Sequence, residues 1–209
     1  MDLLILGASG HGRVVKEVAE ATGKYNRIDF VDDRSDIAVG KVSDLERLHE
    51  IYDSAFAGIG DNHLRNELIH KLKTIGYEIP VFIHPTAYVS KNCHLEKGTI
   101  VEPQAIVNAN TQVGVGCIIS IGAIVDHDVI LGDCVHVNAG AIVKAGGKVE
   151  SEKKLEAGGM VLVYQERVVK PVVEATVEPT VKSMVEPADS NSDFAKEYRE
   201  ATGKEVSFF

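Results

Sequence analysis

The feature that most constrains the fold is an unbroken six-residue period in the second half of the chain. Every sixth residue from Ile83 to Val161 is isoleucine, leucine or valine. Such a period matches neither the repeat of a helix, about 3.6 residues, nor the alternation of a lone strand. It is typical of short strands that alternate with turns and stack into a coil, at about 18 residues per turn of the coil. We therefore expect a parallel β-helix over residues 81–163.

The first part of the chain, residues 1–80, instead alternates short apolar segments with helical ones. Strands are expected at residues 3–6, 28–31 and 54–57, because each is a short apolar run. Helices are expected after the glycine-rich turn that follows the first strand and over residues 62–75, where apolar residues recur at helical spacing. This alternation predicts a small Rossmann-like α/β domain with a parallel sheet.

The ends of these predicted strands carry residues suited to binding a nucleotide. The first strand runs into Gly7-Ala8-Ser9-Gly10-His11-Gly12 and the second into Asp32-Asp33. In parallel α/β sheets ligands bind beyond the carboxyl ends of the strands, where glycines let the backbone approach and helix N-termini attract phosphate. The turn reads G-x-x-G-x-G rather than the usual G-x-G-x-x-G, but Asp32 lies 20 residues past Gly12, where a ribose-binding acid is expected. We expect a nucleotide or nucleotide sugar here; the alternative is a tight turn with acids that cap a loop.

Charge and cysteine content argue against other classes of protein. A net charge of −9 and a pI near 5.4 do not suit a surface that neutralises a nucleic-acid backbone. The first residues show no basic leader and only a short apolar run, so we expect a cytoplasmic protein without membrane insertion. Three cysteines, Cys93, Cys117 and Cys134, show no C-x-x-C spacing and favour neither a disulfide framework nor a zinc cluster.

Motifs from both parts of the chain together resemble those of the NeuD/PglD family of sugar acetyltransferases. They are Gly-Ala-Ser-Gly-His-Gly in the first turn, Ile-Gly-Asp-Asn followed by Arg65, Ile83-His84-Pro85 at the junction, and the hexapeptide repeat. The resemblance covers roughly residues 2–163. It implies a left-handed β-helix, a homotrimer, acetyl-CoA as acyl donor, and the amine or hydroxyl of an activated or acidic sugar as acceptor.

Within the repeat, the turn Val125-Asp126-His127-Asp128-Val129 places an imidazole beside two carboxylates. Acyl transfer to a sugar amine needs a group that removes the amine proton, and the ordinary pKa of histidine suits this task. The family motif of histidine followed by an acid maps onto His127 and Asp128, although many relatives carry glutamate second. The resemblance thus implies His127 as catalytic base and Asp128 as its partner, with Asp126 as a second candidate for orienting the ring. The alternative is a polar turn residue on a solvated corner.

Residues one coil further on are candidates for binding acetyl-CoA. A coil of about 18 residues places Ala145 and Gly146 above His127, in a strip poor in side chains where pantetheine could lie against peptide N–H groups. His136 matches a second family histidine that contacts acetyl-CoA from the neighbouring subunit, with an interface or surface histidine as the alternative. Ser120 stands where some relatives have asparagine near the acceptor, which leaves its role open.

For the nucleotide pocket, the resemblance points to residues at three strand ends. These substrate-binding candidates are Ser9, Gly10, His11, Asp32, Asp33, Gly60 and Arg65. Arg65 could neutralise a phosphate or carboxylate, with an exposed helix arginine as the alternative. We expect no metal, because the carbonic anhydrases built on hexapeptide repeats use two histidines five residues apart, and no two histidines of this repeat have that spacing.

The end of the repeat departs from the family pattern. Residues 151–154 are unusually polar, which suggests a shortened or modified coil, and the further coils usual in the family are absent after Val161. We expect a C-terminal extension over residues 164–209, an extended arm with a short helix.

Taken together, these features favour an acetyl-CoA-dependent acetyltransferase that acts on the amine of an amino-deoxy nucleotide sugar, such as a UDP-sugar, in bacterial surface-glycan biosynthesis. One alternative is an O-acetyltransferase of sialic or other nonulosonic acids. Others are a non-catalytic trimeric scaffold that binds sugar nucleotides and an NAD-linked enzyme. The glycine pattern disfavours the NAD-linked enzyme, and the His127–Asp128 pair disfavours the scaffold.

Overall fold

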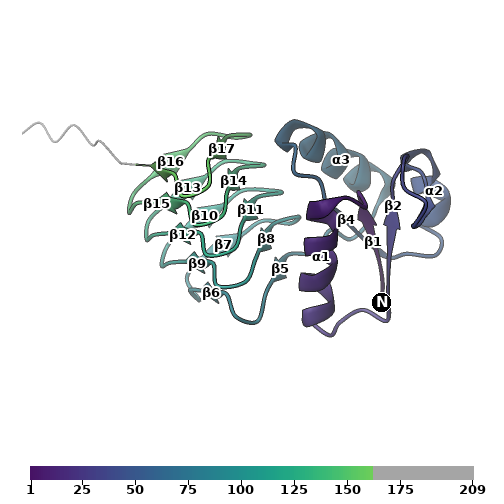
Figure 1. Ribbon diagram of the computed structural model, residues 1–209, viewed down its shortest axis with the longest axis horizontal. Coiled ribbons are helices and arrows are strands. Elements are labelled where there is room, and N and C mark those ends of the chain that lie inside the picture. The colour runs from purple at the N-terminus through teal and green to yellow at the C-terminus, as the bar shows by residue number, and fades with distance from the viewer. Residues whose placement is uncertain (162–209) are drawn as a thin grey trace, which may run out of the picture. The chain divides into compact units, whose positions relative to one another are not determined.

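The structure is a computed structural model that describes residues 1–161, so the extension expected over residues 164–209 lies outside the described residues. The first part is a four-stranded parallel sheet in the order β3-β2-β1-β4, with helices packed against it (Figure 1). Its strands are β1 (Asp2–Leu6), β2 (Arg27–Val31), β3 (Ala38–Gly40) and β4 (Ser54–Ala57). Its helices are α1 (Gly10–Ala21), α2 (Leu45–Leu48) and α3 (Asn62–Ile75), with a 3-10 turn, η1, at Val42–Asp44. The predicted strands and helices are present.

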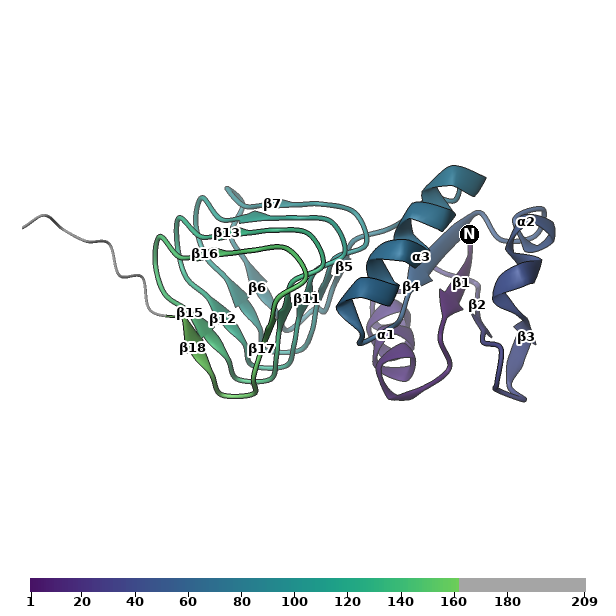
Figure 2. The ribbon, with the colours of Figure 1, turned by 90° about the horizontal axis from the view of Figure 1, so that it is seen from above.

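The second part is a coil of two-residue parallel strands that form three faces (Figure 2). The covered face consists of β5 (Phe82–Ile83), β8 (Ile100–Val101), β11 (Ile118–Ile119), β14 (His136–Val137) and β17 (Lys154–Leu155). The apolar face consists of β6 (Tyr88–Val89), β9 (Ile106–Val107), β12 (Ile124–Val125), β15 (Ile142–Val143) and β18 (Met160–Val161). The polar face consists of β7 (His94–Leu95), β10 (Gln112–Val113), β13 (Ile130–Leu131) and β16 (Lys148–Val149).

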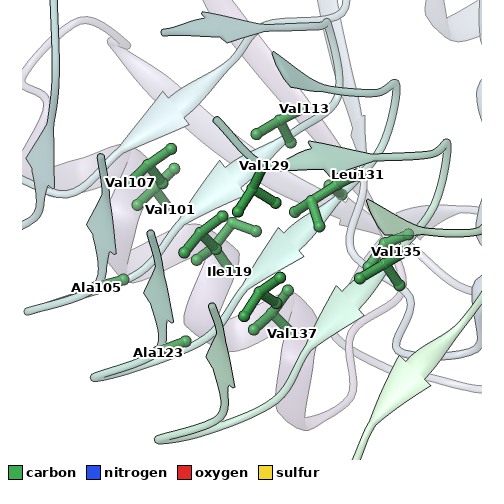
Figure 3. Packing of buried hydrophobic residues seen from close by; sticks show 14 of the residues in the cluster. Val101, Ala105, Val107, Val113, Ile119, Ala123, Val129, Leu131, Val135 and Val137 are labelled. Carbon is green, nitrogen blue, oxygen red and sulfur yellow. The ribbon is translucent and has the colours of Figure 1, made fainter. Parts of the chain in front are cut away.

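The aliphatic row of the repeat forms the interior of this coil (Figure 3). The second residue of each strand points inward, and Val101, Ile119 and Val137 are fully buried. Burial of each such side chain stabilises the fold by roughly 1.5–3 kcal/mol. Partners on neighbouring coils are 18 residues apart, as in the pair of Ile118 with His136. The predicted fold class, a small Rossmann-like α/β domain followed by a left-handed parallel β-helix, is confirmed for the described residues.

The corners of the coil place one residue in six in a left-handed backbone conformation. These residues have φ between 54° and 73° and are Gly98, Gln104, Asn110, Gly116, Gly122, Asp128, Cys134, Gly140, Gly146, Glu152 and Gly158. Glycine, asparagine and aspartate tolerate this conformation better than most other residues, because glycine has no Cβ and the short polar side chains can hydrogen-bond locally. Asp128 therefore occupies a fixed position in its turn.

The α/β domain packs against the covered face. The outward-pointing Phe82, Ile100 and Ile118 are buried against Val15 and Val18 of α1, in a core that also includes residues of β1 and β4. Burial on both sides explains why these strands carry large apolar residues at their outward positions. On the polar face three of the four outward residues are instead histidine, glutamine and lysine, and the fourth is the exposed Ile130. The outward series of the covered face ends in two polar residues, His136 and Lys154.

The polar stretch at residues 151–154 is where the coil meets the start of α3. Asn62 Nδ2 donates to the carbonyl of Glu152 at 2.9 Å, and Asn66 Nδ2 donates to Glu152 Oε1 at 2.7 Å. His63 Nδ1 lies 3.2 Å from Glu152 Oε2. The strand repeat continues through β17 and β18, so the expected shortening does not occur within the described residues. The polar residues instead form a contact between the two parts of the chain.

Candidate functional site

The histidine–carboxylate pair predicted from the repeat lies in the turn between β12 and β13. His127 Nδ1 is 2.7 Å from Asp128 Oδ2, and the two side chains are 54% and 57% exposed. Because an ionised carboxylate only accepts hydrogen bonds, Nδ1 carries the hydrogen and the lone pair is at Nε2. The hydrogen bond raises the pKa of His127 and lowers the pKa of Asp128. The ring is therefore oriented to accept a proton at Nε2.

The backbone of this turn explains how the pair is held. Asp128 has φ of 58°, and its carboxylate also accepts from Asn110 Nδ2 of the coil below at 3.2 Å. Asp126 Oδ1 accepts from the backbone N–H of His127 at 2.8 Å and from Asn108 Nδ2 at 3.2 Å. Asp126 thus shapes the turn, and it is Asp128 that contacts the ring.

The strip above His127 is formed by Ala145 and Gly146, since Ile124 pairs with Ile142 one coil further on. A side chain at Gly146 would meet no atom within 4 Å, so the strip faces open space. The N–H of Gly146, however, donates to the carbonyl of His127 at 2.9 Å. This N–H is therefore already used within the coil and is not free to bind pantetheine, and the exposed surface of the strip remains a candidate for that contact.

The strand ends of the α/β domain enclose a cavity of about 400 Å³ that contains Asp32 and Asp33. Asp32 Oδ2 accepts from the N–H of Ala8 in the glycine-rich turn at 2.9 Å, which lowers the pKa of Asp32. A Cβ at Gly12 would lie 1.9 Å from the carbonyl oxygen of Gly7, so only glycine lets α1 begin this close to β1. The two predicted acids thus line one strand-end pocket together with Gly7 of the glycine-rich turn.

Gly60 lines a second cavity, of about 530 Å³, together with Asp61, Asn62, His63, Glu152 and Lys154. This cavity lies where the loop after β4 and the start of α3 meet the end of the covered face. The substrate-binding candidates are therefore divided between two cavities, and Ser9 and Gly10 are exposed beside the start of α1.

His11 and His136, predicted for different ligands, lie together in a polar cluster between α1 and the covered face. Their ring centroids are 6.5 Å apart. His136 Nε2 is 3.0 Å from Ser120 Oγ, and His11 Nδ1 is 3.7 Å from Glu102 Oε1. Burial, reinforced by the charge of Arg65, lowers the pKa of both histidines to about 4. Both rings are therefore neutral at physiological pH, and His11 Nε2 and His136 Nδ1 have no hydrogen-bond partner among residues 1–161.

Arg65 requires a correction. Its side chain is fully buried rather than exposed to a ligand. It donates to the carbonyls of Gly116 at 2.7 Å, Cys134 at 2.8 Å and Ile59 at 2.9 Å, and to Asn62 Oδ1 at 2.8 Å. The prediction that Arg65 binds substrate is wrong, because its guanidinium is committed to joining the α/β domain to two corners of the coil.

Glu102 is the member of the cluster that the sequence analysis missed. It is 7% exposed, its Oε2 accepts from the N–H of Ile121 at 2.9 Å, and burial raises its pKa. It stands one coil before Ser120, at the same turn position, so stacking the hexads in register would have placed it beside that residue. The contact between Glu102 and His11 could not be predicted, because the residues around each of them in the sequence show no pattern that indicates it.

His127 and the buried cluster lie on different parts of the coil. His127 follows the apolar face, whereas His136 belongs to the covered face, so a single chain does not bring the predicted base to the strand-end pockets. Over residues 1–161 no three His, Cys, Asp or Glu side chains gather as metal ligands would. The described helices include none of the length and apolarity needed to cross a membrane.

Comparison with known proteins identifies relatives of both parts. Residues 2–72 match the family model of the PglD N-terminal domain. UDP-N-acetylbacillosamine N-acetyltransferase of Bacillus subtilis (strain 168) is 29% identical over 111 residues, a match that spans 48% of this chain and only 50% of that protein. The acetyltransferase domain of PglB from Neisseria gonorrhoeae FA1090, solved with acetyl coenzyme A, is 32% identical with a TM-score of 0.74, over 76% of this chain and 80% of that one. A mutant of perosamine N-acetyltransferase from Caulobacter crescentus, solved with CoA and GDP-perosamine, is 29% identical with a TM-score of 0.72, over 78% and 89%.

Proposed function

Because the chain belongs to the NeuD/PglD-like family of sugar acetyltransferases, we propose that it transfers the acetyl group of acetyl-CoA to the amine of an amino-deoxy nucleotide sugar. The solved relatives support the donor and the acceptor class, since one binds acetyl coenzyme A and another binds CoA with GDP-perosamine. A UDP- or GDP-linked 4-amino sugar of bacterial surface-glycan biosynthesis is the acceptor we propose.

The observation that carries this proposal is the geometry of His127 and Asp128. With Nδ1–H donated to Asp128 at 2.7 Å, His127 Nε2 accepts the proton that the sugar amine loses as it attacks the thioester carbonyl. The amine nitrogen forms the new bond to the acetyl carbon, the carbon–sulfur bond breaks, and the proton held on Nε2 is available to the departing thiolate. Asp128 stabilises the imidazolium between these two transfers.

The proposed acetyl-CoA contacts are the strip at Ala145 and Gly146 and, contributed by a neighbouring subunit, the neutral ring of His136. The open surface above Gly146 is next to His127, which suits a thioester that must reach Nε2. His136 keeps one ring nitrogen without a partner among the described residues, as a group that contacts a ligand would. For the acceptor we retain Ser9, Gly10, His11, Asp32, Asp33 and Gly60, with Arg65 removed.

We further propose that the protein works as a homotrimer, because the apolar face carries a stacked hydrophobic row whose members are exposed or partly exposed. The outward residues of this face are Tyr88, Ile106, Ile124, Ile142 and Met160, stacked in register. Tyr88 and Met160 are 59% and 53% exposed, which is unusual for a row of this length. A second copy packed on this stripe would also border the turn of His127. A cytoplasmic location, where thiols stay reduced, belongs to the same proposal, and the unpaired Cys117 and Cys134 fit it.

The decisive experiment measures thiol release from acetyl-CoA with a panel of acceptors. The panel contains UDP- and GDP-linked 4-amino sugars, the matching sugars without the amine, and sialic acid. We expect release only with an amino sugar, together with a product that gains one acetyl group on nitrogen by mass spectrometry. Release with sialic acid alone would assign the chain to O-acetylation, and no release with any acceptor would contradict an enzymatic function.

A further inference from the structure

The cavity at the start of α3 has an unusual charge pattern. It lies beyond the carboxyl end of β4, where Gly60 leaves the backbone open, and its opposite wall is the end of the covered face. The charged side chains around it are those of Asp61, His63, Glu152 and Lys154. The cavity can bind a ligand only through those charged side chains that have no partner within the protein.

Both carboxylates of the cavity are occupied. Asp61 caps α3, since its Oδ1 accepts from the N–H of Leu64 at 2.8 Å. Glu152 uses one oxygen to accept from Asn66 and the other to contact His63, and these hydrogen bonds lower its pKa. The carboxylate of Glu152 in turn stabilises the protonated ring of His63, which raises the pKa of His63. His63 Nε2 also lies 3.5 Å from Glu67 Oε1, so Asp61, Glu152 and His63 make a set of contacts that does not involve Lys154.

Lys154 is outside this set. It is the outward residue of β17, one coil beyond His136, and it has no salt bridge or side-chain hydrogen bond to any of residues 1–161. The neighbouring rings of His11 and His136 are neutral at physiological pH, since their pKa values are about 4. The exposed ammonium of Lys154 is thus a cation without a direct partner among residues 1–161, beside a strand end that is open to a ligand.

We propose that Lys154 binds the diphosphate of the nucleotide-sugar acceptor and thereby selects nucleotide-linked sugars over free ones. This inference rests on the proposed acetylation of a nucleotide sugar. A diphosphate brings more than one negative charge to a chain whose net charge is −9, so a local cation is needed to offset the repulsion. An ammonium donates hydrogen bonds to phosphate oxygens in any direction, which suits a flexible diphosphate. A loop glycine such as Gly60 lets the diphosphate approach the backbone.

The polar stretch at residues 151–154 then has two separate tasks. Glu152 bonds the coil to α3. Lys154 lies two residues later, on the outward side of the strand, and lines the cavity. Lys154 is the last outward residue of the covered face, after Phe82, Ile100, Ile118 and His136. The outward residues change from apolar to cationic where the α/β domain stops covering the sheet. The cation is therefore located at the edge of the cover, where it is accessible.

The test compares Lys154→Gln, Lys154→Arg and a matched control, Lys148→Gln, by calorimetric titration of the full chain with UDP and GDP. Lys148 is the outward residue of β16 in the same turn of the coil, but it belongs to the polar face. We expect Lys154→Gln to weaken binding of the preferred nucleotide by roughly tenfold or more. Lys154→Arg should bind within a few-fold of the parent, Lys148→Gln should match it, and all variants should melt at the parent temperature.

The possible outcomes distinguish a failure of this inference from a failure of the proposed function. Equal binding by the parent and Lys154→Gln would overturn the role of Lys154 and leave the nucleotide-sugar acceptor in place. Weaker binding in Lys154→Gln that arginine does not restore, or that comes with a lower melting temperature, would indicate a structural role and also overturn it. If the parent acetylates an acceptor but binds neither UDP nor GDP, the nucleotide-sugar acceptor itself is contradicted. If Lys154→Gln weakens sialic acid and not the nucleotides, the anion recognised is a carboxylate and not a diphosphate.

Discussion

Two of the histidine–carboxylate pairs in the described residues, one exposed and one buried, behave in opposite ways. His127 and Asp128 lie on a solvated corner, 2.7 Å apart, and the pKa of His127 is raised. His11 and Glu102 lie under the α/β domain, 3.7 Å apart, with side chains 16% and 9% exposed, and the pKa of His11 is lowered to about 4. The residue types are nearly the same, so the surroundings decide.

The difference follows from solvation. At the corner, water solvates both charges, and the short hydrogen bond favours the protonated ring. Under the domain, the cost of desolvating an imidazolium exceeds the attraction of a carboxylate at 3.7 Å, and the charge of Arg65 adds to that cost. The exposed pair is therefore suited to taking up and releasing a proton, and the buried ring to hydrogen bonding as a neutral group.

The comparison predicts the largest effect on activity at the exposed pair. His127→Ala should lower kcat/KM for acetyl transfer by roughly 100- to 10,000-fold, the range for loss of a general base. The measurement is thiol release with an accepted amino sugar. His94→Ala is the matched control, because His94 is also exposed on the coil, 2.9 Å from Glu96, and should retain full activity. An unchanged rate in His127→Ala would remove His127 from the mechanism.

The buried pair depends on the interface that Arg65 holds together. Arg65→Ala leaves two coil carbonyls and one loop carbonyl without their donor, so the free energy of unfolding should fall by roughly 3–5 kcal/mol and Tm by roughly 6–20 °C. Calorimetry or circular dichroism measures the change. Arg47→Ala is the control, since the Arg47 side chain is 63% exposed on α2 and should shift Tm little. Equal shifts in the two variants would show that the hydrogen bonds of Arg65 contribute nothing specific.

Much of the coil was predictable from the sequence because its determinants are local and periodic. The aliphatic row fixed the stacking, a register of 18 residues placed Ala145 above His127, and adjacency along the chain joined His127 to Asp128. These relations repeat at short range, so a single sequence displays them.

The contacts between the two parts were not predictable in the same way. Arg65 reaches the carbonyls of Gly116 and Cys134, which lie 51 and 69 residues further along the chain, and a carbonyl acceptor carries no mark in the sequence. Glu152 meets Asn62 and Asn66 across 90 and 86 residues. The polar stretch at residues 151–154 was visible in the sequence, but its cause, the packing of α3 against the coil, was not.

A smaller effect tests the pKa of the exposed pair. In Asp128→Asn the ring loses its ionised acceptor and faces an amide that can also donate, so kcat should fall by roughly tenfold or more as the productive tautomer is lost. The carboxylate raises the pKa of His127, and only the neutral ring accepts a proton; its removal should therefore move the acidic limb of the pH–rate profile to lower pH. Glu102→Gln is the counterpart at the buried pair and should leave that limb where it is. A limb that does not move in Asp128→Asn would show that another group controls it.

The smallest effect concerns the buried rings. The pKa values of His11 and His136 are lowered from 6.5 to about 4, so between these values the unfolded chain binds more protons than the folded one. Stability is then fully present above about pH 6.5 and is lost as the pH falls towards 4, by roughly 1–3 kcal/mol for each ring. Glu102, whose pKa is raised, keeps its proton more readily when folded and offsets part of this loss.

Denaturant unfolding of the full chain at pH 7, 6 and 5 measures this dependence. The double variant His11→Gln, His136→Gln should have a lower free energy of unfolding at pH 7 but lose less of it on acidification, because the two rings that resist protonation are gone. His94→Gln should keep the full dependence of the parent, since the side chain of His94 is 70% exposed. If the double variant loses stability with pH as steeply as the parent, burial does not hold these rings neutral. The contrast between the two histidine–carboxylate pairs would then reduce to the hydrogen bond between His127 and Asp128.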